Sequence, residues 1–465
     1  MGRIYLTCIL YTLYAFLSAI ICCRPMLKDA RATVTSSIPT IARYFTTKGR
    51  YEEVNPHLIG DIYAVNRSFL QALPPGCREM HLSAIIRHGT RYPTSKNVVK
   101  MQRLYNLIVH NASGNAIWVR EIKEKFVMWY TEDMDGRLVD KGVLDHKHLA
   151  VRLSKLFPSL VSREKLRGGK ISFVTSSKHR CVNSTLAFKR GLTDLWSVEE
   201  EVEHTVNDTL MRFFDECPRF VKEVEKNPDS MAERDNFELG PEMQRVGEKM
   251  ADRLGLQYNL INPDMTGAAF HFCAYEFAIN TVNSPWCRLF DEVDAQVMEY
   301  LNDLKQYWKR GYGHKINSYL SCILFHDLFS RLDKAAEESK SGGPISEAVS
   351  IQVGHAETLL PLLTLLGLFK DEVPLTAANF AAQGGRSFRT SRTLPYAANL
   401  VVALYDCDEG GELRVQALLN EEPLTFPGMV AAPLYRVLRQ HYLPLLQSCA
   451  FEDVCRLPPP HPQRK

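Results

Sequence analysis

The sequence predicts an α/β fold, with a mostly parallel sheet flanked by helices and a mainly α-helical domain inserted into it. Three times along the chain, an apolar, β-branched run is followed by a short polar segment and then by a helical pattern. Strands that alternate with helices in this way form parallel sheets covered on both faces. Between the second and third units, residues 185–345 carry only amphipathic helical patterns, which predict the inserted domain. One continuous domain with long excursions is the alternative.

The polar segments of the three units lie where their strands end. The predicted strands are residues 82–86, 171–174 and 348–353, with a further strand at 400–405. The segments after the first three strands are 87–93, 175–180 and 354–357. After the first segment, apolar residues at spacings of three and four predict a helix that Thr94 or Ser95 would cap. Because ligands of parallel sheets gather outside the carboxyl ends of the strands, these segments are the predicted site.

The chain is predicted to contain six stretches. Its two ends are polar or proline-rich, and neither composition favours a packed core. The α/β domain is formed by two parts of the chain on either side of the helical insert. In order, the stretches are a signal peptide (1–23), a flexible segment (24–50), the first part of the α/β domain (51–184), the helical domain (185–345), the second part of the α/β domain (346–455) and a flexible tail (456–465).

The first 23 residues are typical of a secretory signal, because Arg3 precedes a long apolar stretch that ends near small residues. The stretch is almost long enough to span a bilayer, so an uncleaved anchor is the alternative. We favour cleavage and expect no stable membrane anchor afterwards. Twelve cysteines and several N-glycosylation sequons support a secretory route. The sequons are at Asn66, Asn111 and Asn207, and at Asn183, which lies in a predicted helix where a glycan fits less well.

Charge and cysteine spacing argue against two classes of protein. A net charge of +3 and a pI of about 8.2 fall well short of the basic footprint of a nucleic-acid-binding protein. Any attraction for anions must therefore be local. No CxxC spacing occurs, so structural zinc is not expected. Loss of Cys8, Cys22 and Cys23 with the signal leaves an odd number of cysteines, so at least one thiol is free or pairs between chains.

The polar segments hold the residue types that attack on a phosphate monoester requires. Such an ester carries close to two negative charges, and the guanidinium groups of Arg87, Arg91 and Arg180 match its oxygens bidentately. His88 lies between two of these arginines, which lower its pKa and keep a ring nitrogen free to attack phosphorus. Gly89 lets the backbone turn sharply toward the ligand.

The third segment supplies the remaining groups. An alkoxide leaving group departs slowly unless an acid protonates it, and Glu357 is the candidate proton donor. His355 would donate a hydrogen bond to a phosphate oxygen and, as imidazolium, would add a further charge. Lys178, within the second segment, and Thr94, just after the first, are candidate substrate-binding residues. Taken alone, Gly-His-x-Glu before an apolar helix is more often a capped helix start, so this interpretation depends on the three segments together.

Two other polar pairs are interpreted as structural. His326 and Asp327 lie among apolar residues in a helical pattern and are expected either on a solvated helix face or in a packing contact between helices. Lys309 and Arg310 form a basic pair that we expect on the solvent-exposed face of a helix.

The two main motifs resemble a known family. The run Arg-His-Gly-Thr-Arg-Tyr-Pro at 87–93, with Gly-His-Ala-Glu at 354–357, resembles the histidine acid phosphatases. Most relatives carry His-Asp at the second motif. The His-Ala-Glu found here is typical of the branch that acts on inositol polyphosphates, which is related to the phytases. Similar segments extend over roughly residues 77–455.

The resemblance implies a phosphoglycerate mutase-like α/β domain beside a helical domain, a phosphohistidine intermediate, and neither a metal nor another cofactor. It implies hydrolysis of inositol hexakisphosphate and lower inositol polyphosphates, with 2,3-bisphosphoglycerate as a further candidate substrate. The implied roles are nucleophile for His88, proton donor for Glu357, and phosphate binding for Arg87, Arg91, Arg180 and His355. The implied disulfides are Cys77–Cys407, Cys273–Cys287 and Cys449–Cys455, which leave Cys181, Cys217 and Cys322 over.

Three alternatives for the function stay open. A broad-specificity histidine acid phosphatase would act on phosphoproteins or small monoesters, and an inactive lumenal protein would keep the fold and only bind anions. A phosphoglycerate mutase-like transferase shares Arg-His-Gly, but it is cytosolic, which the signal and the sequons oppose. The chain ends in Pro-Gln-Arg-Lys, where vertebrate members of this branch usually carry a KDEL-type tail. We therefore expect either the endoplasmic reticulum lumen or secretion.

Overall fold

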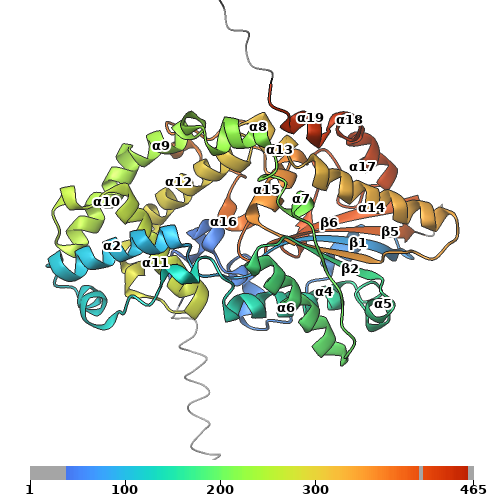
Figure 1. Cartoon of the computed structure of the whole chain (residues 1–465), viewed down its shortest axis with the longest axis horizontal. Coiled ribbons are helices and arrows are strands. Elements are labelled where there is room, and N and C mark those ends of the chain that lie inside the picture. Colours follow the sequence, from blue (N-terminus) through green and yellow to red (C-terminus); the bar gives the residue numbers. More distant parts are fainter. Residues whose placement is uncertain (1–37, 408–411, 459–465) are drawn as a thin grey trace, which may run out of the picture.

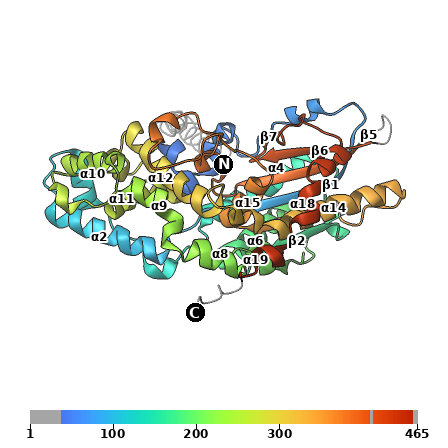
Figure 2. The same ribbon diagram turned by 90° about the horizontal axis from the view of Figure 1, so that it is seen from above.

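The computed structural model describes residues 38–407 and 412–458. The predicted signal peptide, residues 24–37 and residues 459–465 lie outside the described residues. Figure 1 shows a sheet with helices on both faces and, beside it, a group of long helices; the view from above in Figure 2 shows the same two regions. No helix in the described ranges is long and apolar enough to cross a membrane.

The sheet combines a parallel part with an antiparallel part. β1 pairs in parallel with β4, β4 with β2 and β2 with β3, whereas β5, β6 and β7 continue the sheet from β1 as antiparallel neighbours, in the order β3-β2-β4-β1-β5-β6-β7. The predicted parallel α/β core is confirmed, and the antiparallel edge makes the sheet mixed. The strands are β1 Arg78–Arg87, β2 Ile171–Thr175, β3 Thr205–Val206, β4 Val349–Gly354, β5 Asn399–Cys407, β6 Glu412–Leu419 and β7 Glu422–Leu424.

Side chains of β1 alternate between two separate apolar cores, as the period of two of a strand requires. Ala84 and Ile86 pack into the core on one face, and Ile85 packs into the core on the other. The first face is covered by α4 (Asp140–Leu156) and α6 (His179–Trp196), and the second by α14 (Cys322–Lys340) and α15 (Ala356–Leu365). Residues 82–86 of β1 are buried on both sides, and four of these five residues are apolar.

The long helices beside the sheet draw on more of the chain than predicted. α2, which precedes the predicted helical domain, packs against α11, whereas α14, which falls within 185–345, lies on the sheet. α6 also passes through the predicted boundary at residue 185. The division into domains stays a prediction. The helices beside the sheet are α2 Ser95–Asn111, α9 Ala232–Glu238, α10 Pro241–Leu254, α11 Pro263–Asn280 and α12 Glu292–Arg310.

Shorter helices connect these elements. They are α3 Ile117–Arg120, α5 Arg163–Arg167, α7 Asp208–Met211, α8 Pro218–Phe220, α13 Lys315–Tyr319, α16 Thr390–Thr393, α17 Tyr435–His441, α18 Leu443–Ser448 and α19 Phe451–Cys455.

Residues 38–50 correct the prediction of a flexible segment over 24–50. They form two short 3-10 turns and are mostly buried. The ring of Phe45 packs edge-on against Phe270 and Phe277 of α11, with ring centroids 5.5 and 6.2 Å apart. The polar composition of this segment did not indicate its burial, because a few apolar side chains are enough to hold a short segment in a core formed by distant helices.

The described chain contains four disulfides, and one of the predicted pairs is wrong. Cys449 does not bond to Cys455. Cys455 lies at the end of α19, which contacts α8 beside Cys217, and Cys449 meets the first residue of α14, Cys322. The four bridges are Cys77–Cys407 and Cys273–Cys287, which were expected, and Cys217–Cys455 and Cys322–Cys449.

The four sequon asparagines differ in exposure. Asn66, Asn111 and Asn207 are exposed, and the side chain of Asn207 also caps α7 by accepting a hydrogen bond from the Leu210 amide. Asn183 is half-buried on α6. Glycosylation at these positions stays a prediction.

Candidate active site

The three predicted polar segments meet at one edge of the sheet. Arg87, the last residue of β1, is level with Gly354 of β4, and Thr175 of β2 is level with Val353. The carboxyl ends of these three parallel strands therefore lie side by side. This register brings together residues that are almost 270 positions apart in the sequence.

The main chain of His88 is held by two neighbouring strands. Its amide donates to the Gly354 carbonyl across 3.0 Å, and its own carbonyl accepts from the Ala397 amide at 3.1 Å, just before β5. The side chain is also buried. The imidazole ring is therefore fixed at the centre of the edge.

Hydrogen bonding selects one tautomer of His88. Nδ1 lies 2.9 Å from the carbonyl oxygen of Gly89, and because a carbonyl oxygen only accepts, Nδ1 carries the hydrogen. Nε2 then carries the lone pair. Burial, and after it the charges of Arg180 and Arg87, hold the pKa of His88 well below its usual value of 6.5. The ring is neutral and nucleophilic at neutral pH.

α4 and α6 hold the loop that follows His88. The Gly89 amide donates to Ser184 Oγ of α6 at 3.0 Å. Thr90 donates to Asp145 Oδ2 of α4 from both its amide, at 2.9 Å, and its hydroxyl, at 2.7 Å. A Cβ atom on Gly89 would lie 2.3 Å from the Gly142 carbonyl oxygen, so only glycine permits this approach to α4.

Arg87 is a buried cation with an anchored side chain. Its Nη1 donates to the Leu394 carbonyl across 2.6 Å, and its guanidinium group lies 4.8 Å from the ring centroid of Tyr396. Burial lowers the pKa of Arg87 to about 10, so the group stays charged at neutral pH. Its Nε is buried without a hydrogen-bond partner among the described residues, and the same holds for Arg180. Both arginines keep a donor for an anionic ligand.

Arg91 contributes a third cation. Its Nη1 donates to the Tyr92 carbonyl at 2.7 Å and lies 3.5 Å from the Tyr275 hydroxyl. Burial opposes its charge, but Tyr275, Tyr396 and Glu357 outweigh burial and raise the pKa of Arg91. Arg91 therefore stays charged.

His355 is linked to the second strand end. Arg180 Nη2 lies 3.2 Å from His355 Nδ1, so Nδ1 accepts, and Nε2 carries the hydrogen toward Ser176 Oγ at 2.9 Å. Burial, and then Arg180, lower the pKa of His355 to about 3. The expected imidazolium is therefore not favoured by these surroundings. The His355 and His88 rings face each other edge-on, with centroids 5.7 Å apart.

A free thiol lies behind His355. Cys181 is buried, and its Sγ lies 3.2 Å from the Gly354 carbonyl oxygen and 3.5 Å from His355 Nε2. Burial raises the pKa of this thiol to about 12, so it stays protonated. Among the described residues, Cys181 is the unpaired cysteine that the odd count predicts.

Glu357 lies in the first turn of α15, two residues after His355. Burial would raise its pKa, but the charges of Arg310 and then His355 outweigh burial and lower the pKa to about 2. Arg310 was expected on an exposed face, and that expectation is wrong. Its side chain is only 10% exposed, because it pairs with Glu225 and its guanidinium group lies 5.3 Å from the Phe220 ring centroid.

A basic cavity lies within electrostatic range of the site, and its residues were not predicted. The cavity has a volume of about 180 Å³, and Lys48 and Lys305 line it together with Lys100, Arg234 and His271. Lys100 pairs with Asp264, and Arg234 pairs with Glu238. Neither Lys48 nor Lys305 forms an ion pair with any described residue. Two of the lysines that line the cavity are therefore not paired with a carboxylate.

The two lysines without an ion pair, Lys48 and Lys305, interact electrostatically with groups of the site. Burial, and after it Arg91 and Lys305, hold the pKa of Lys48 well below its usual value. Lys305 is reachable by solvent, yet the cavity walls desolvate it, and Lys309 adds repulsion, so its pKa is also lowered. A bound anion favours the charged form of both lysines and so offsets the effects of burial and of the neighbouring cations.

The other candidate residues have clear positions. Lys178 is the exposed N-cap of α6, and Thr94 is the half-buried N-cap of α2; substrate binding by either stays a prediction. His326 Nε2 lies 2.7 Å from the Cys449 carbonyl, and Asp327 binds Arg331. These contacts of His326 and Asp327 agree with a packing contact between helices.

Comparisons with known proteins show the family of the chain. Residues 80–420 match the histidine phosphatase superfamily (branch 2). Multiple inositol polyphosphate phosphatase 1 of Gallus gallus is 47% identical over 421 residues, covering 89% of this chain and 93% of the relative. The Homo sapiens protein of that name is 44% identical over 465 residues, covering 95% and 94%.

Solved structures show the same fold. The phytase from D. castellii superimposes with a TM-score of 0.70 at 14% identity, covering 89% of this chain and 87% of that one. Multiple inositol polyphosphate phosphatase of Bifidobacterium longum, in complex with inositol hexasulfate, has a TM-score of 0.63 at 14% identity, covering 83% and 93%. On the sequence matches and the shared architecture, the chain belongs to branch 2 of the histidine phosphatase superfamily.

Proposed function

We propose that the protein hydrolyses the phosphate monoesters of inositol hexakisphosphate and lower inositol polyphosphates through a phosphohistidine at His88. The observation that carries the substrate class is the pair of unpaired lysines, Lys48 and Lys305, beside the phosphate-site arginines. A single phosphate needs only the arginines at the strand ends. Cations in the adjoining cavity are useful when the substrate carries further phosphates.

In the first half-reaction, Nε2 of His88 attacks phosphorus while the bond from phosphorus to the inositol oxygen breaks. Arg87, Arg91 and Arg180 hold the equatorial oxygens and balance their charge. Glu357 gives its proton to the departing oxygen, so that the alcohol leaves neutral. The products of this half are the alcohol and the phosphohistidine.

In the second half-reaction, water attacks the phosphorus of the phosphohistidine. The carboxylate of Glu357 takes a proton from that water, the bond from phosphorus to Nε2 breaks, and inorganic phosphate leaves. Glu357 ends protonated and His88 neutral, as they began the cycle.

With a pKa this low, Glu357 is ionised at neutral pH before substrate binds, whereas a proton donor must carry a proton. The value of about 2 reflects the cations of the protein alone. A phosphate dianion beside the carboxylate offsets those cations and favours the protonated form, so that substrate binding itself raises the pKa. The proton donor is thus formed together with the substrate complex, and hydrolysis is favoured at acidic pH.

We also infer a secretory location, in the endoplasmic reticulum lumen or outside the cell. The described chain contains four disulfides, three of which join distant segments, and such bridges persist in oxidising compartments.

The test of the mechanism is a rapid quench with substrate labelled at phosphorus. Wild-type protein is expected to carry base-stable, acid-labile phosphate on His88, and His88→Ala is expected to carry none and to lose turnover. His110→Ala, which changes an exposed histidine on α2, serves as the matched control and should keep both. Full turnover in His88→Ala would rule the mechanism out.

The test of the substrate class is a comparison of turnover across inositol hexakisphosphate, lower inositol phosphates, phosphotyrosine and 2,3-bisphosphoglycerate. A clear preference for the inositol polyphosphates is expected. Equal turnover of all these esters would instead favour a broad acid phosphatase.

A further inference from the structure

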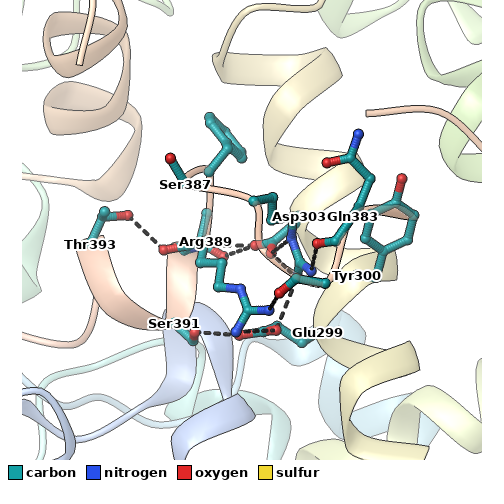
Figure 3. A network of polar contacts seen from close by, with 12 residues as sticks. Glu299, Tyr300, Asp303, Gln383, Ser387, Arg389, Ser391 and Thr393 are labelled. Atoms are coloured by element: carbon teal, nitrogen blue, oxygen red, sulfur yellow. Dashed lines mark hydrogen bonds and ion pairs between the residues drawn. The ribbon is translucent and has the colours of Figure 1, made fainter. Parts of the chain in front are cut away.

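A buried polar network connects α12 to the segment that precedes β5 (Figure 3). Asp303 of α12 accepts hydrogen bonds at Oδ1 from the Thr390 amide, at 2.9 Å, and the Thr390 hydroxyl, at 2.7 Å. Its Oδ2 accepts from Arg386 Nε at 3.1 Å and Nη2 at 2.7 Å. Both oxygens of one carboxylate are therefore used to hold residues 386–390.

Glu299, one helical turn before Asp303, completes the network. Its Oε2 accepts from Arg386 Nη2 at 2.9 Å, and its Oε1 accepts from the Ser391 hydroxyl. The side chains of Glu299, Asp303 and Arg386 are at most 3% exposed. A buried ion network of this kind rarely adds much stability over apolar residues of the same volume, so its value lies in fixing a geometry.

The other end of the same segment contacts the phosphate site directly. The Leu394 carbonyl accepts from Arg87 Nη1, and the Tyr396 ring packs against the Arg87 guanidinium group. The Ala397 amide donates to the His88 carbonyl. Residues 386–397, here called the clamp segment, thus run from the acidic pair of α12 to the catalytic loop.

The clamp segment is short, and hydrogen bonds hold it between its two ends. Residues 390–393 form α16, a single helical turn, and the Leu394 amide donates to the Thr390 carbonyl across 3.0 Å. Asn420 holds the other side of the turn through the Arg392 carbonyl at 3.1 Å. A shift of Thr390 is therefore transmitted to the Leu394 carbonyl four residues later.

We propose that Glu299 and Asp303 are positioning residues that set the Arg87 guanidinium group through the clamp segment. The inference rests on the proposed function, because that function gives Arg87 its phosphate. It extends the site into the helical region, where the hydrogen-bond partners of both side chains belong to the clamp segment.

The primary test measures the inhibition constant for inorganic phosphate, together with kcat and KM for an aryl phosphate, in Asp303→Asn and Glu299→Gln. Displacement of Arg87 should weaken phosphate inhibition and lower kcat/KM by about 10- to 100-fold, since an error of about 1 Å in a positioned group costs that much. The matched control is Asp294→Asn. Asp294 lies on the same helix, is equally buried and pairs with Lys249 and Arg253, with no link to the clamp segment. It should lose stability without losing phosphate inhibition.

A double-mutant cycle separates positioning from general damage. In an Arg87→Ala background, Asp303→Asn should cause no further loss of phosphate inhibition, because the group that it positions is gone. Additive losses would overturn the inference, as would unchanged phosphate inhibition in folded Asp303→Asn.

A milder variant keeps the test decisive if Asp303→Asn does not fold. Thr390→Val removes only one hydrogen bond to Asp303 and leaves the Arg386 ion pairs intact, and the same loss is expected in smaller degree. Unchanged phosphate inhibition there would overturn the inference. If the wild type shows no turnover, the proposed function fails, but calorimetric binding of inorganic phosphate to the same variants still tests the positioning role.

Discussion

Nδ1 of His88 lies 2.9 Å from the carbonyl oxygen of Gly89, the next residue along the chain. The main chain next to His88 therefore orients the proposed nucleophile, and no carboxylate is needed to select the tautomer. The same residue, Gly89, touches the backbone of α4 so closely that a side chain is excluded. Tautomer and loop position are thus set by one local conformation.

The first prediction concerns the pH dependence of His88. Its neutral form is the nucleophile, and this form is lost as the pH falls through its pKa, which burial, Arg180 and Arg87 hold well below 6.5. Between pH 6.5 and pH 5, kcat/KM for an aryl phosphate should not show the loss that an ordinary histidine would cause. Arg180→Gln removes the strongest opposing charge, so the pKa of His88 should rise and the acidic limb should move to higher pH.

Arg190→Gln is the matched control for that experiment, because Arg190 lies exposed on the same helix and pairs with Asp194. Its pH profile should equal that of the wild type. An acidic limb that stays in place in Arg180→Gln would remove Arg180 as a cause of the low pKa.

The second prediction concerns Glu357 as the proton donor. Alkyl phosphates need protonation of the leaving oxygen far more than aryl phosphates do. Glu357→Gln should therefore slow the hydrolysis of an alkyl phosphate on the order of 100-fold or more, within the usual range for general acid catalysis, and that of an aryl phosphate much less. The measurement is kcat for each ester. Equal slowing of both would mean that Glu357 is not the acid.

The third prediction concerns the two unpaired lysines of the cavity. Lys48→Ala and Lys305→Ala should each raise KM for inositol hexakisphosphate by about 10- to 100-fold, the usual loss for one hydrogen bond to a charged group. KM for a small aryl phosphate should change little, because that ester does not extend into the cavity. The control is Lys147→Ala, which alters a lysine of α4 that pairs with Asp194 of α6, and it should leave both values unchanged. Equal effects on both esters would remove the cavity as a site for additional phosphates.

Much of the site follows from local sequence patterns. Arg87, His88, Arg180, His355 and Glu357 each lie in the short polar segment that follows a predicted strand, and parallel strand ends lie at one edge of a sheet. Their convergence therefore needs no knowledge of long-range contacts. The strands themselves were recognisable because burial on both faces makes them mostly apolar and rich in β-branched residues.

The residues that were missed depend on contacts between distant parts of the chain. Lys48 reaches the site because Phe45 packs on α11, more than 200 residues away. Arg310 is buried because Phe220 and Glu225, from another segment, cover it. The local pattern around each shows only a polar stretch or a basic pair, so neither burial could be predicted. The pairing of Cys455 with Cys217 was missed for the same reason.

The last prediction uses two helical glycines with opposite surroundings. A Cβ atom on Gly142 of α4 would lie 2.1 Å from the Thr90 carbonyl oxygen, whereas a Cβ on Gly267 of α11 meets nothing within 4 Å. Alanine inside a helix normally stabilises by about 0.5–1 kcal/mol relative to glycine, and Gly267→Ala should show this gain in the free energy of unfolding. Gly142→Ala should instead destabilise by about 1–3 kcal/mol, as forced overpacking does, and should lower kcat because Thr90 belongs to the loop of His88. Urea unfolding and turnover measured on both variants check this, and a gain of stability in both would contradict the close approach of α4 to the catalytic loop.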